Sequence, residues 1–278
     1  MRVQAFAKIN LSLRVLGTRD DGYHELRTMF QSIALHDTLT IRAIRGPFQL
    51  TCDDPACPAD ATNLIWRAAA AMWNAAGRRG APRNVAIDLQ KRIPMQAGLG
   101  GGSSDAAAAL RVLARRWRVN RARVRAVAKS LGADVPYFLE GGTVLGVDRG
   151  DRLIPHADHP PAWVVIVLPN FGVSTKEAFG WFDGSPQRAA LPDVGNDLEA
   201  PVVARHPEIG RIISALRRSG ASRAAMSGSG SAVFGLFPNR LAATRAAKRL
   251  SSRLPSRARR AILTRTLNRQ RYQILAGN

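Results

Sequence analysis

Cysteine is scarce in this chain of 278 residues: only Cys52 and Cys57 occur, with four residues between them. Small secreted domains held by disulfides carry many more cysteines, and one C-x-x-x-x-C pair without a partner pair is a weak pattern for zinc. We therefore expect two reduced thiols beside a loop, a cytoplasmic location and no metal-ligand residues.

Long apolar runs are also missing. No stretch of about 18 or more apolar residues occurs, although a helix that spans a bilayer needs roughly 20. The first residues, 1–8, lack the apolar core of a signal peptide. Aromatic residues make up only 6% of the chain, yet 46% of all residues are hydrophobic. We expect no membrane contact, and a core large enough for one large or two moderate domains.

Acidic residues are few: 20 Asp and Glu face 41 Lys and Arg, and the formal net charge is +21. Most of the excess lies in two stretches that contain no acid, 111–129 and 240–278. Such stretches suggest nucleic-acid binding. Their arginines, however, are spaced along predicted amphipathic helices, which is typical of solvated surfaces, and the same field would attract a polyanionic substrate. We therefore do not expect nucleic acid as the main partner.

The most informative segment is a glycine-rich loop that leads directly into a predicted helix. Its glycines permit backbone conformations closed to other residues and let main-chain N–H groups approach an anion. The helix N-terminus adds unpaired N–H groups and a partial positive charge. The sequence therefore predicts a phosphate site here. This segment, called the glycine loop below, comprises Pro94, Met95, Gln96, Ala97, Gly98, Leu99, Gly100, Gly101, Gly102, Ser103 and Ser104.

Two common phosphate motifs do not fit the glycine loop. No Gly-Lys-Ser/Thr follows the glycines, as a Walker A motif requires, and the third glycine of the dinucleotide fingerprint G-x-G-x-x-G is missing. A flexible turn with a serine helix cap would also fit. By itself the loop indicates phosphate and nothing finer.

Strand and helix patterns mix along the chain without regular alternation. Strands are predicted over 3–16, within 28–44, and over 84–89, 143–147, 152–154, 163–168 and 261–267. Helices are predicted over 63–76, 104–117, 121–131, 208–219 and 241–254. A second glycine- and serine-rich turn, residues 226–231, lies between two apolar strands. The pattern predicts an α+β fold in two domains, 1–155 and 156–278.

Three further segments carry chemistry-bearing side chains. Lys8 and Asn10 stand two apart in a predicted strand and therefore share a face. Asp134 follows a helix end among apolar residues, and Tyr23 and His24 place an aromatic ring beside an imidazole. Each also fits a structural role: a charge on a strand edge, an aspartate that forms a turn, and a surface turn.

Taken together, these segments resemble the GHMP kinase superfamily, small-molecule kinases whose phosphate loop has the form P-x-x-x-G-L-G-S-S. The matching stretches are 7–11, 21–24, 63–65, the glycine loop, 131–136 and 226–230. Within the superfamily they resemble the branch that acts in non-mevalonate isoprenoid precursor biosynthesis. The resemblance implies a two-domain GHMP kinase fold, with an N-terminal ATP-binding domain and the active site in the cleft between the domains.

The resemblance also implies a reaction: the γ-phosphate of ATP passes to the tertiary 2-hydroxyl of a methylerythritol that carries a cytidine diphosphate group. Asp134 would be the catalytic base and Lys8 its partner. A tertiary alcohol is a poor nucleophile, and an aspartate both positions it and accepts its proton late in the transfer.

On the donor side, the resemblance implies ATP and Mg²⁺ as cofactors, with the glycine loop around the phosphates. Ser103 and Ser104 would add hydroxyl groups. Asp105, in the first turn of the predicted helix, would complement the helix dipole, with a water-mediated contact to the metal as the other possibility. Asn63 and Lys91 would border the adenine.

On the acceptor side, the resemblance implies that Tyr23 and Phe179 sandwich the cytosine and that His24 hydrogen-bonds its edge. Asn10 and Thr175 would line the acceptor pocket. Another GHMP kinase, such as a homoserine or mevalonate kinase, is the alternative, and the Tyr23–His24 pair disfavours it because those acceptors have no base to stack. The expected partner is a small molecule, and the protein is expected to be a monomer or homodimer.

Overall fold

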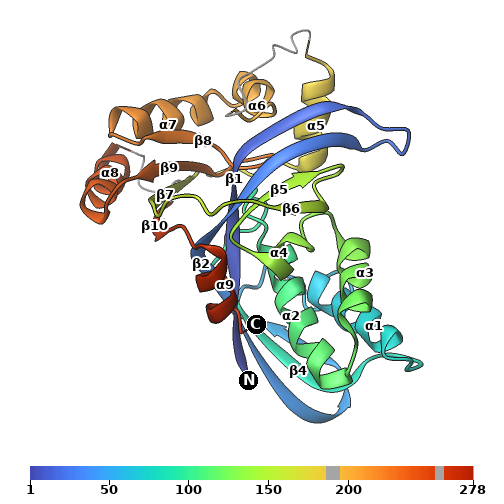
Figure 1. Ribbon diagram of the computed structural model, residues 1–278. Coiled ribbons are helices and arrows are strands. Elements are labelled where there is room, and N and C mark those ends of the chain that lie inside the picture. The colour runs from blue at the N-terminus through green and yellow to red at the C-terminus, as the bar shows by residue number, and fades with distance from the viewer. Residues whose placement is uncertain (186–194, 254–259, 278) are drawn as a thin grey trace.

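The computed structural model describes residues 1–185, 195–253 and 260–277. Two sheets, each with helices packed on it, form the described part of the chain (Figure 1). The first sheet has six strands from the N-terminal half, and the second has four strands from the C-terminal half. The α+β prediction is confirmed.

The first sheet is built around one long antiparallel ribbon. Strand β1 (Arg2–Thr18) pairs with β2 (His24–Pro47) along nearly its whole length. On its other edge, β2 pairs with β4 (Arg83–Gln90) and, farther toward its N-terminus, with β5 (Thr143–Val147). The order is completed by β3 (Gln49–Cys52), parallel to β4, and by β6 (Arg152–Pro155), antiparallel to β5.

Three helices cover this sheet: α1 (Leu64–Ala75), α2 (Gly101–Trp117) and α3 (Arg121–Leu131). The first and third begin at asparagines whose side chains cap the helix. Helix α2 packs through consecutive alanines, 106–109, which are fully buried. Their small side chains allow the helix backbone to lie close to its neighbours. The short helix α4 (Tyr137–Glu140) follows α3.

The second sheet is antiparallel in the order β10 (Arg260–Arg265), β7 (Trp163–Leu168), β9 (Val233–Phe237) and β8 (Arg223–Met226). Its helices are α5 (Thr175–Asp183), α6 (Glu199–Arg205), α7 (Pro207–Arg218) and α8 (Arg240–Arg253). Helix α7 buries Ile209, Ile212, Ile213 and Leu216, whose spacing forms one apolar stripe.

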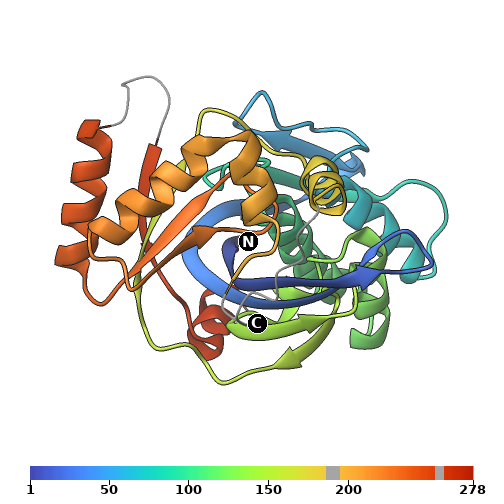
Figure 2. The ribbon, with the colours of Figure 1, turned by 90° about the horizontal axis from the view of Figure 1, so that it is seen from above.

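The two sheets meet in a shared apolar core. Ile9 and Ile33 of the first sheet pack with Ile166 and Phe234 of the second, and Leu99 of the glycine loop joins them. The glycine loop is therefore anchored where the two halves of the chain touch. Figure 2 shows the sheets from above, with α7 and α8 on one side and α3 on the other.

The last helix, α9 (Arg269–Leu275), returns to the first sheet. Tyr272 of α9 is fully buried against Phe6 of β1, with ring centroids 5.6 Å apart. Its hydroxyl donates to the Phe138 carbonyl at 2.6 Å. The predicted domain limits, 1–155 and 156–278, stay a prediction, and α9 contributes to the packing of the first half.

Most predicted elements are confirmed, and the differences are local. Helix α2 begins at Gly101 rather than at residue 104, because Gly100 takes the left-handed conformation that caps it. Sequence patterns missed β3, α4, α5, α6 and α9, although a capping box at Ser174 and Glu177 marks the start of α5. Helix α5 ends at Asp183, and residues 186–194 lie outside the described residues. Residue 254, at the end of the predicted helix 241–254, also lies outside them.

Candidate active site

A cavity of about 1170 Å³ is lined by both halves of the chain. Its walls come from β1, β2, the glycine loop, the segment before α4, helix α5 and the turn at 228–230. Single-ligand pockets usually measure roughly 300–1,000 Å³, so this cavity has room for more than one small molecule. Every residue predicted for the site lines it except Ser104.

The glycine loop presents free main-chain amides to this cavity. Gly100 has φ +72°, and the first backward bond of α2 runs from the Ser104 amide to the Gly100 carbonyl at 2.9 Å. The amides of Gly101, Gly102 and Ser103 precede that bond, so they have no acceptor within the helix. Unpaired amides at the positive end of a helix dipole are suited to an anion, which is the role that the sequence predicts for them.

Gly98 shows why the loop needs glycine. Its φ is +73°, and a Cβ atom there would lie 2.1 Å from the Ser227 carbonyl oxygen. The Ser227 hydroxyl donates to the Gly98 carbonyl at 3.0 Å. The glycine loop and the turn at 226–231 are therefore interlocked through their backbones, and the turn is part of the cavity wall.

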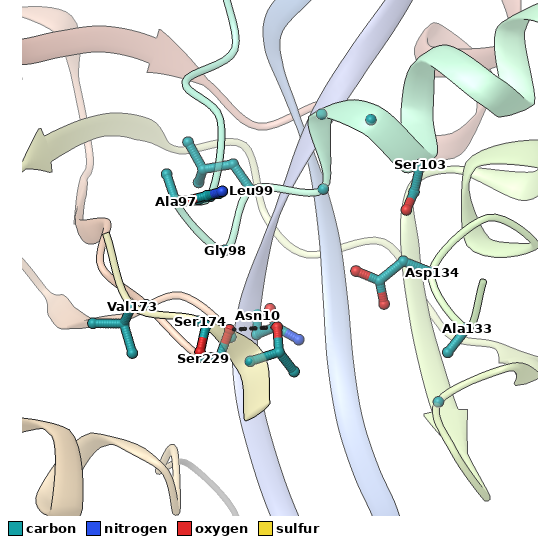
Figure 3. Close-up of a pocket in the computed structure, with 18 of the residues that line it drawn as sticks. Asn10, Ala97, Gly98, Leu99, Ser103, Ala133, Asp134, Val173, Ser174 and Ser229 are labelled. Atoms are coloured by element: carbon teal, nitrogen blue, oxygen red, sulfur yellow. Dashed lines mark hydrogen bonds between the residues drawn. The ribbon is translucent and has the colours of Figure 1, made fainter. Parts of the chain in front are cut away.

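The structure corrects the role expected for Ser104. This residue is 1% exposed, and its hydroxyl donates to the Phe6 carbonyl at 2.7 Å. The side chain therefore ties α2 to β1 and does not reach the cavity. Ser103 does line the cavity, and Figure 3 shows its hydroxyl directed toward Asp134.

Lys8 connects the glycine loop with Asp134 across the cavity. Its side chain is 4% exposed, and Nζ lies 3.5 Å from Oδ2 of Asp134. The same nitrogen donates to the Gly98 carbonyl at 2.9 Å and to Asn10 Oδ1 at 2.6 Å. Asn10 in turn donates to the Thr28 hydroxyl at 2.7 Å, which fixes the orientation of its amide. The ammonium group is thus held in place, while Asp134 remains one-third exposed to the cavity.

A buried charged cluster lies behind the glycine loop. Lys91, directly after β4, pairs with Asp37 of β2 at 2.5 Å and with Asp105 of α2 at 2.9 Å. The other oxygen of Asp37 accepts from the Arg92 and Ile93 amides. The sequence suggested that Asp105 complements the helix dipole. In the structure it also ties α2, through Lys91, to the end of β4, the strand that leads into the glycine loop.

Within this cluster, burial favours the neutral form of Asp105, whereas Lys91 stays charged. Burial raises the pKa of Asp105 to about 8, although Lys91 pulls it down, and its Oδ1 is buried without a hydrogen-bond partner among the described residues. Burial alone would lower the pKa of Lys91, but Asp105 and Asp37 raise it above its ordinary value. A lysine held this way stays charged, and it also lines the cavity.

The three side chains predicted to bind the cytosine, Tyr23, His24 and Phe179, all line the cavity, and their role stays a prediction. The His24 ring stacks on Phe179, with centroids 4.5 Å apart, and its Nε2 lies 2.9 Å from Asp183. Tyr23 is 57% exposed, and its ring lies under the Arg149 guanidinium at 5.1 Å. The structure thus brings His24 and Phe179 together and adds Asp183 and Arg149, which sequence patterns did not reveal.

Thr175 closes the far wall of the cavity. Its hydroxyl lies 3.2 Å from that of Ser229, so the start of α5 contacts the turn at 226–231. Figure 3 shows Ser174 and Ser229 across the cavity from Ser103 and Asp134.

The described residues include no group of three or more His, Cys, Asp or Glu arranged to hold a metal ion. None of the described helices is both long and apolar enough to cross a membrane.

Comparison with known proteins gives the class first. The chain matches the GHMP kinases N terminal domain over residues 63–142 and the GHMP kinases C terminal domain over residues 186–256. Its fold resembles that of homoserine kinase from Cytophaga hutchinsonii, with a TM-score of 0.71 at 17% identity over 98% of this chain and 96% of that one. At that identity the likeness concerns the fold alone.

Relatives of higher sequence identity indicate one branch of the GHMP kinases. The chain is 43% identical to 4-diphosphocytidyl-2-C-methyl-D-erythritol kinase of Anaeromyxobacter dehalogenans (strain 2CP-C), over 95% of this chain and 90% of the relative. It is 39% identical to the enzyme of that name from Moorella thermoacetica, over 96% and 99%. A crystal structure of 4-(cytidine 5'-diphospho)-2C-methyl-D-erythritol kinase superposes with a TM-score of 0.80 at 35% identity, over 96% and 99%. The chain belongs to the 4-diphosphocytidyl-2-C-methyl-D-erythritol kinase family of GHMP kinases.

Proposed function

We propose that the protein transfers the γ-phosphate of ATP to the 2-hydroxyl of 4-diphosphocytidyl-2-C-methyl-D-erythritol. One observation carries the proposal: the Lys8 ammonium contacts both the glycine loop, through the Gly98 carbonyl, and the Asp134 carboxylate. A phosphate held by the loop and an alcohol held by Asp134 would therefore meet beside one fixed positive charge. The names of the family's members supply the identity of the acceptor.

On the donor side, the amides of Gly101, Gly102 and Ser103 would bind the phosphates at the start of α2. The chain fits a magnesium ion carried by ATP, because Mg²⁺ usually keeps several waters and binds phosphate oxygens with few protein ligands, and Ser103 offers a hydroxyl oxygen at this end of the cavity. When bound, the ion would neutralise charge on the β- and γ-phosphates. Lys91, buried beside Gly101, would hold the loop in position.

On the acceptor side, Asp134 would orient the tertiary hydroxyl and take its proton as the bond to phosphorus forms. Lys8 would stabilise the negative charge that develops on the oxygen. The transition state of phosphoryl transfer is largely dissociative, so positioning of the alcohol matters more than its early deprotonation. Asn10 keeps Lys8 aimed at this point through its 2.6 Å hydrogen bond.

The cytidine group would lie at the mouth of the cavity near Tyr23 and Phe179. His24 lies against the Phe179 ring and is oriented by Asp183, so its Nδ1 could meet the edge of the base. Arg149, which covers the Tyr23 ring, would face the diphosphate. The cytoplasmic location and the monomeric or homodimeric state inferred from the sequence stay predictions.

An acceptor-choice assay tests the proposed function. Purified protein with ATP and Mg²⁺ should release ADP when the cytidine-linked acceptor is added, and should not do so with homoserine or mevalonate. Turnover with either of those two alcohols and none with the cytidine-linked one would overturn the assignment.

The base assignment has its own test in Asp134→Asn. We expect ATP binding to be retained and turnover to fall by about 10²–10⁴-fold, the contribution of a positioned acid–base group. Equilibrium binding of an ATP analogue and single-turnover kinetics would separate the two effects. A near-normal rate would show that Asp134 is not the base.

A further inference from the structure

A second cavity, of about 500 Å³, lies among α2, α3, α4 and α9. It shares no lining residue with the main cavity. Its wall includes part of the basic stretch 111–129, to which the proposed function gives no role. The proposed kinase activity therefore leaves both the cavity and this charge without an explanation.

The cavity is strongly cationic. Four of its lining residues are arginines, and its only acid is Glu140, which pairs with Arg125 at 3.2 Å. The four arginines are Arg111, Arg115, Arg121 and Arg125. Guanidinium groups gathered around a hollow repel one another unless an anion lies between them. Their planar donor geometry matches phosphate oxygens in particular.

Arg111 contributes a positive charge that no carboxylate of the described residues neutralises. Its Nη1 donates to the Phe138 carbonyl at 2.6 Å, whereas its Nε and Nη2 are buried and have no hydrogen-bond partner among the described residues. No carboxylate of the described residues forms an ion pair with it. The guanidinium carbon lies 6.0 Å from the centre of the Tyr272 ring. Its positive charge therefore stays available to attract an anion into the cavity.

The remaining walls are apolar. Ala114, Val119, Val124 and Leu139 line the cavity beside the arginines, and Val124 is buried. A bare inorganic anion would leave this surface exposed to water. A ligand with a phosphate group and a small hydrocarbon group would use both kinds of wall.

We propose that this cavity is a second binding site, distinct from the catalytic cavity, for an organic diphosphate that carries a short hydrocarbon group. The diphosphate would lie among Arg111, Arg115, Arg121 and Arg125, and the hydrocarbon would contact the apolar wall. The proposal goes beyond the proposed kinase reaction and does not depend on which alcohol that reaction uses.

The test is titration calorimetry with hexyl diphosphate in the presence of saturating ADP, which occupies the glycine loop. The key variant is Arg115→Gln/Arg121→Gln, because neither side chain makes a hydrogen bond or ion pair with the described residues. The matched control is Arg118→Gln/Lys129→Gln, which removes the same charge at exposed positions outside the cavity, one at the C-cap of α2 and one in α3.

We expect the cavity variant to bind hexyl diphosphate at least about tenfold more weakly than the parent, through loss of charge-assisted hydrogen bonds. The control should stay within about twofold, because surface charges act weakly when no contact is lost. Kinase turnover without hexyl diphosphate should be unchanged in both variants, so failure of this proposal is distinguishable from failure of the proposed function.

Four results would overturn the proposal. If the cavity variant and the control lose affinity for hexyl diphosphate equally, the effect depends only on net charge. Loss of binding on addition of ADP would place the ligand in the catalytic cavity, and inorganic pyrophosphate binding as tightly as hexyl diphosphate would remove any role for the hydrocarbon. If hexyl diphosphate fails to bind and a DNA duplex binds with steep salt dependence, the arginines serve nucleic acid instead.

Discussion

The buried cluster of Lys91, Asp37 and Asp105 allows a quantitative prediction, because its two carboxylates are held in different ways. Asp37 accepts from Lys91 and from two main-chain amides. Asp105 accepts from Lys91 alone, and its second oxygen has no partner among the described residues. We therefore expect Asp37→Asn to be severe and Asp105→Asn to be mild, although both change one carboxylate to an amide.

The size of each effect follows from burial and charge. Asp37→Asn leaves the buried Lys91 with its better partner removed, which typically costs about 3–5 kcal/mol of unfolding free energy. Burial raises the pKa of Asp105 from 3.8 to about 8, so near neutrality the folded protein holds a proton that the unfolded chain has released. This contribution to stability is present below about pH 4 and is lost as the pH rises toward 8, at roughly 1.4 kcal/mol per pH unit.

The assay is urea unfolding followed by tryptophan fluorescence at pH 5 and pH 7. Between pH 5 and pH 7 the unfolding free energy of the parent should fall by about 2–3 kcal/mol because of Asp105. Asp105→Asn should not show this part of the fall, because an amide does not titrate. The KM for ATP should rise in Asp37→Asn, where the glycine loop loses its support. The reasoning fails if the two variants are equally destabilised at pH 7, or if Asp105→Asn keeps the pH dependence of the parent.

Three further predictions concern single side chains. Ser104→Ala should lower the unfolding free energy in urea by about 1–3 kcal/mol, because the Phe6 carbonyl loses its partner, and should leave the KM for ATP unchanged. Ser103→Ala should raise the KM for ATP without loss of stability. The reverse pattern would refute both assignments. Gly98→Ala should raise the KM for ATP and lower the unfolding midpoint, since the added Cβ would meet the turn at 226–231; parent-like values in both measurements would show that the loop can adapt. Tyr23→Ala should raise the acceptor KM more than it lowers kcat, as lost uniform binding does, and equal changes in steady-state kinetics would make Tyr23 structural.

Local patterns in the sequence carried much of the fold. The period of apolar residues predicted α1, α3 and α7, and asparagine caps mark where the first two begin. The start of α2 was missed by three residues because a left-handed Gly100, rather than a serine, precedes the helix. Helix α9 was missed altogether, since its burial depends on Phe6 at the other end of the chain.

Some residues of the candidate site could be found from the sequence, and others could not. The glycine loop, Lys8, Asn10 and Asp134 could be found from the sequence because each lies in a short motif with a recognisable chemistry. Asp183, which orients His24, could not, since the two residues are 159 positions apart and no local pattern joins them. The second cavity is likewise invisible in the sequence, where its arginines look like the solvated face of two helices.

By itself, the sequence predicted a phosphate site at the glycine loop, and its order of motifs predicted the family, which the comparisons confirm. Glycine conformations, helix caps and neighbouring side chains act over a few residues, so a sequence displays them directly. Only the tertiary structure decided that Ser104 supports β1 while Ser103 faces the cavity, and that Lys91 draws Asp37 and Asp105 together. Burial and hydrogen-bond partners depend on which elements pack against each other, and that is a property of the folded chain as a whole.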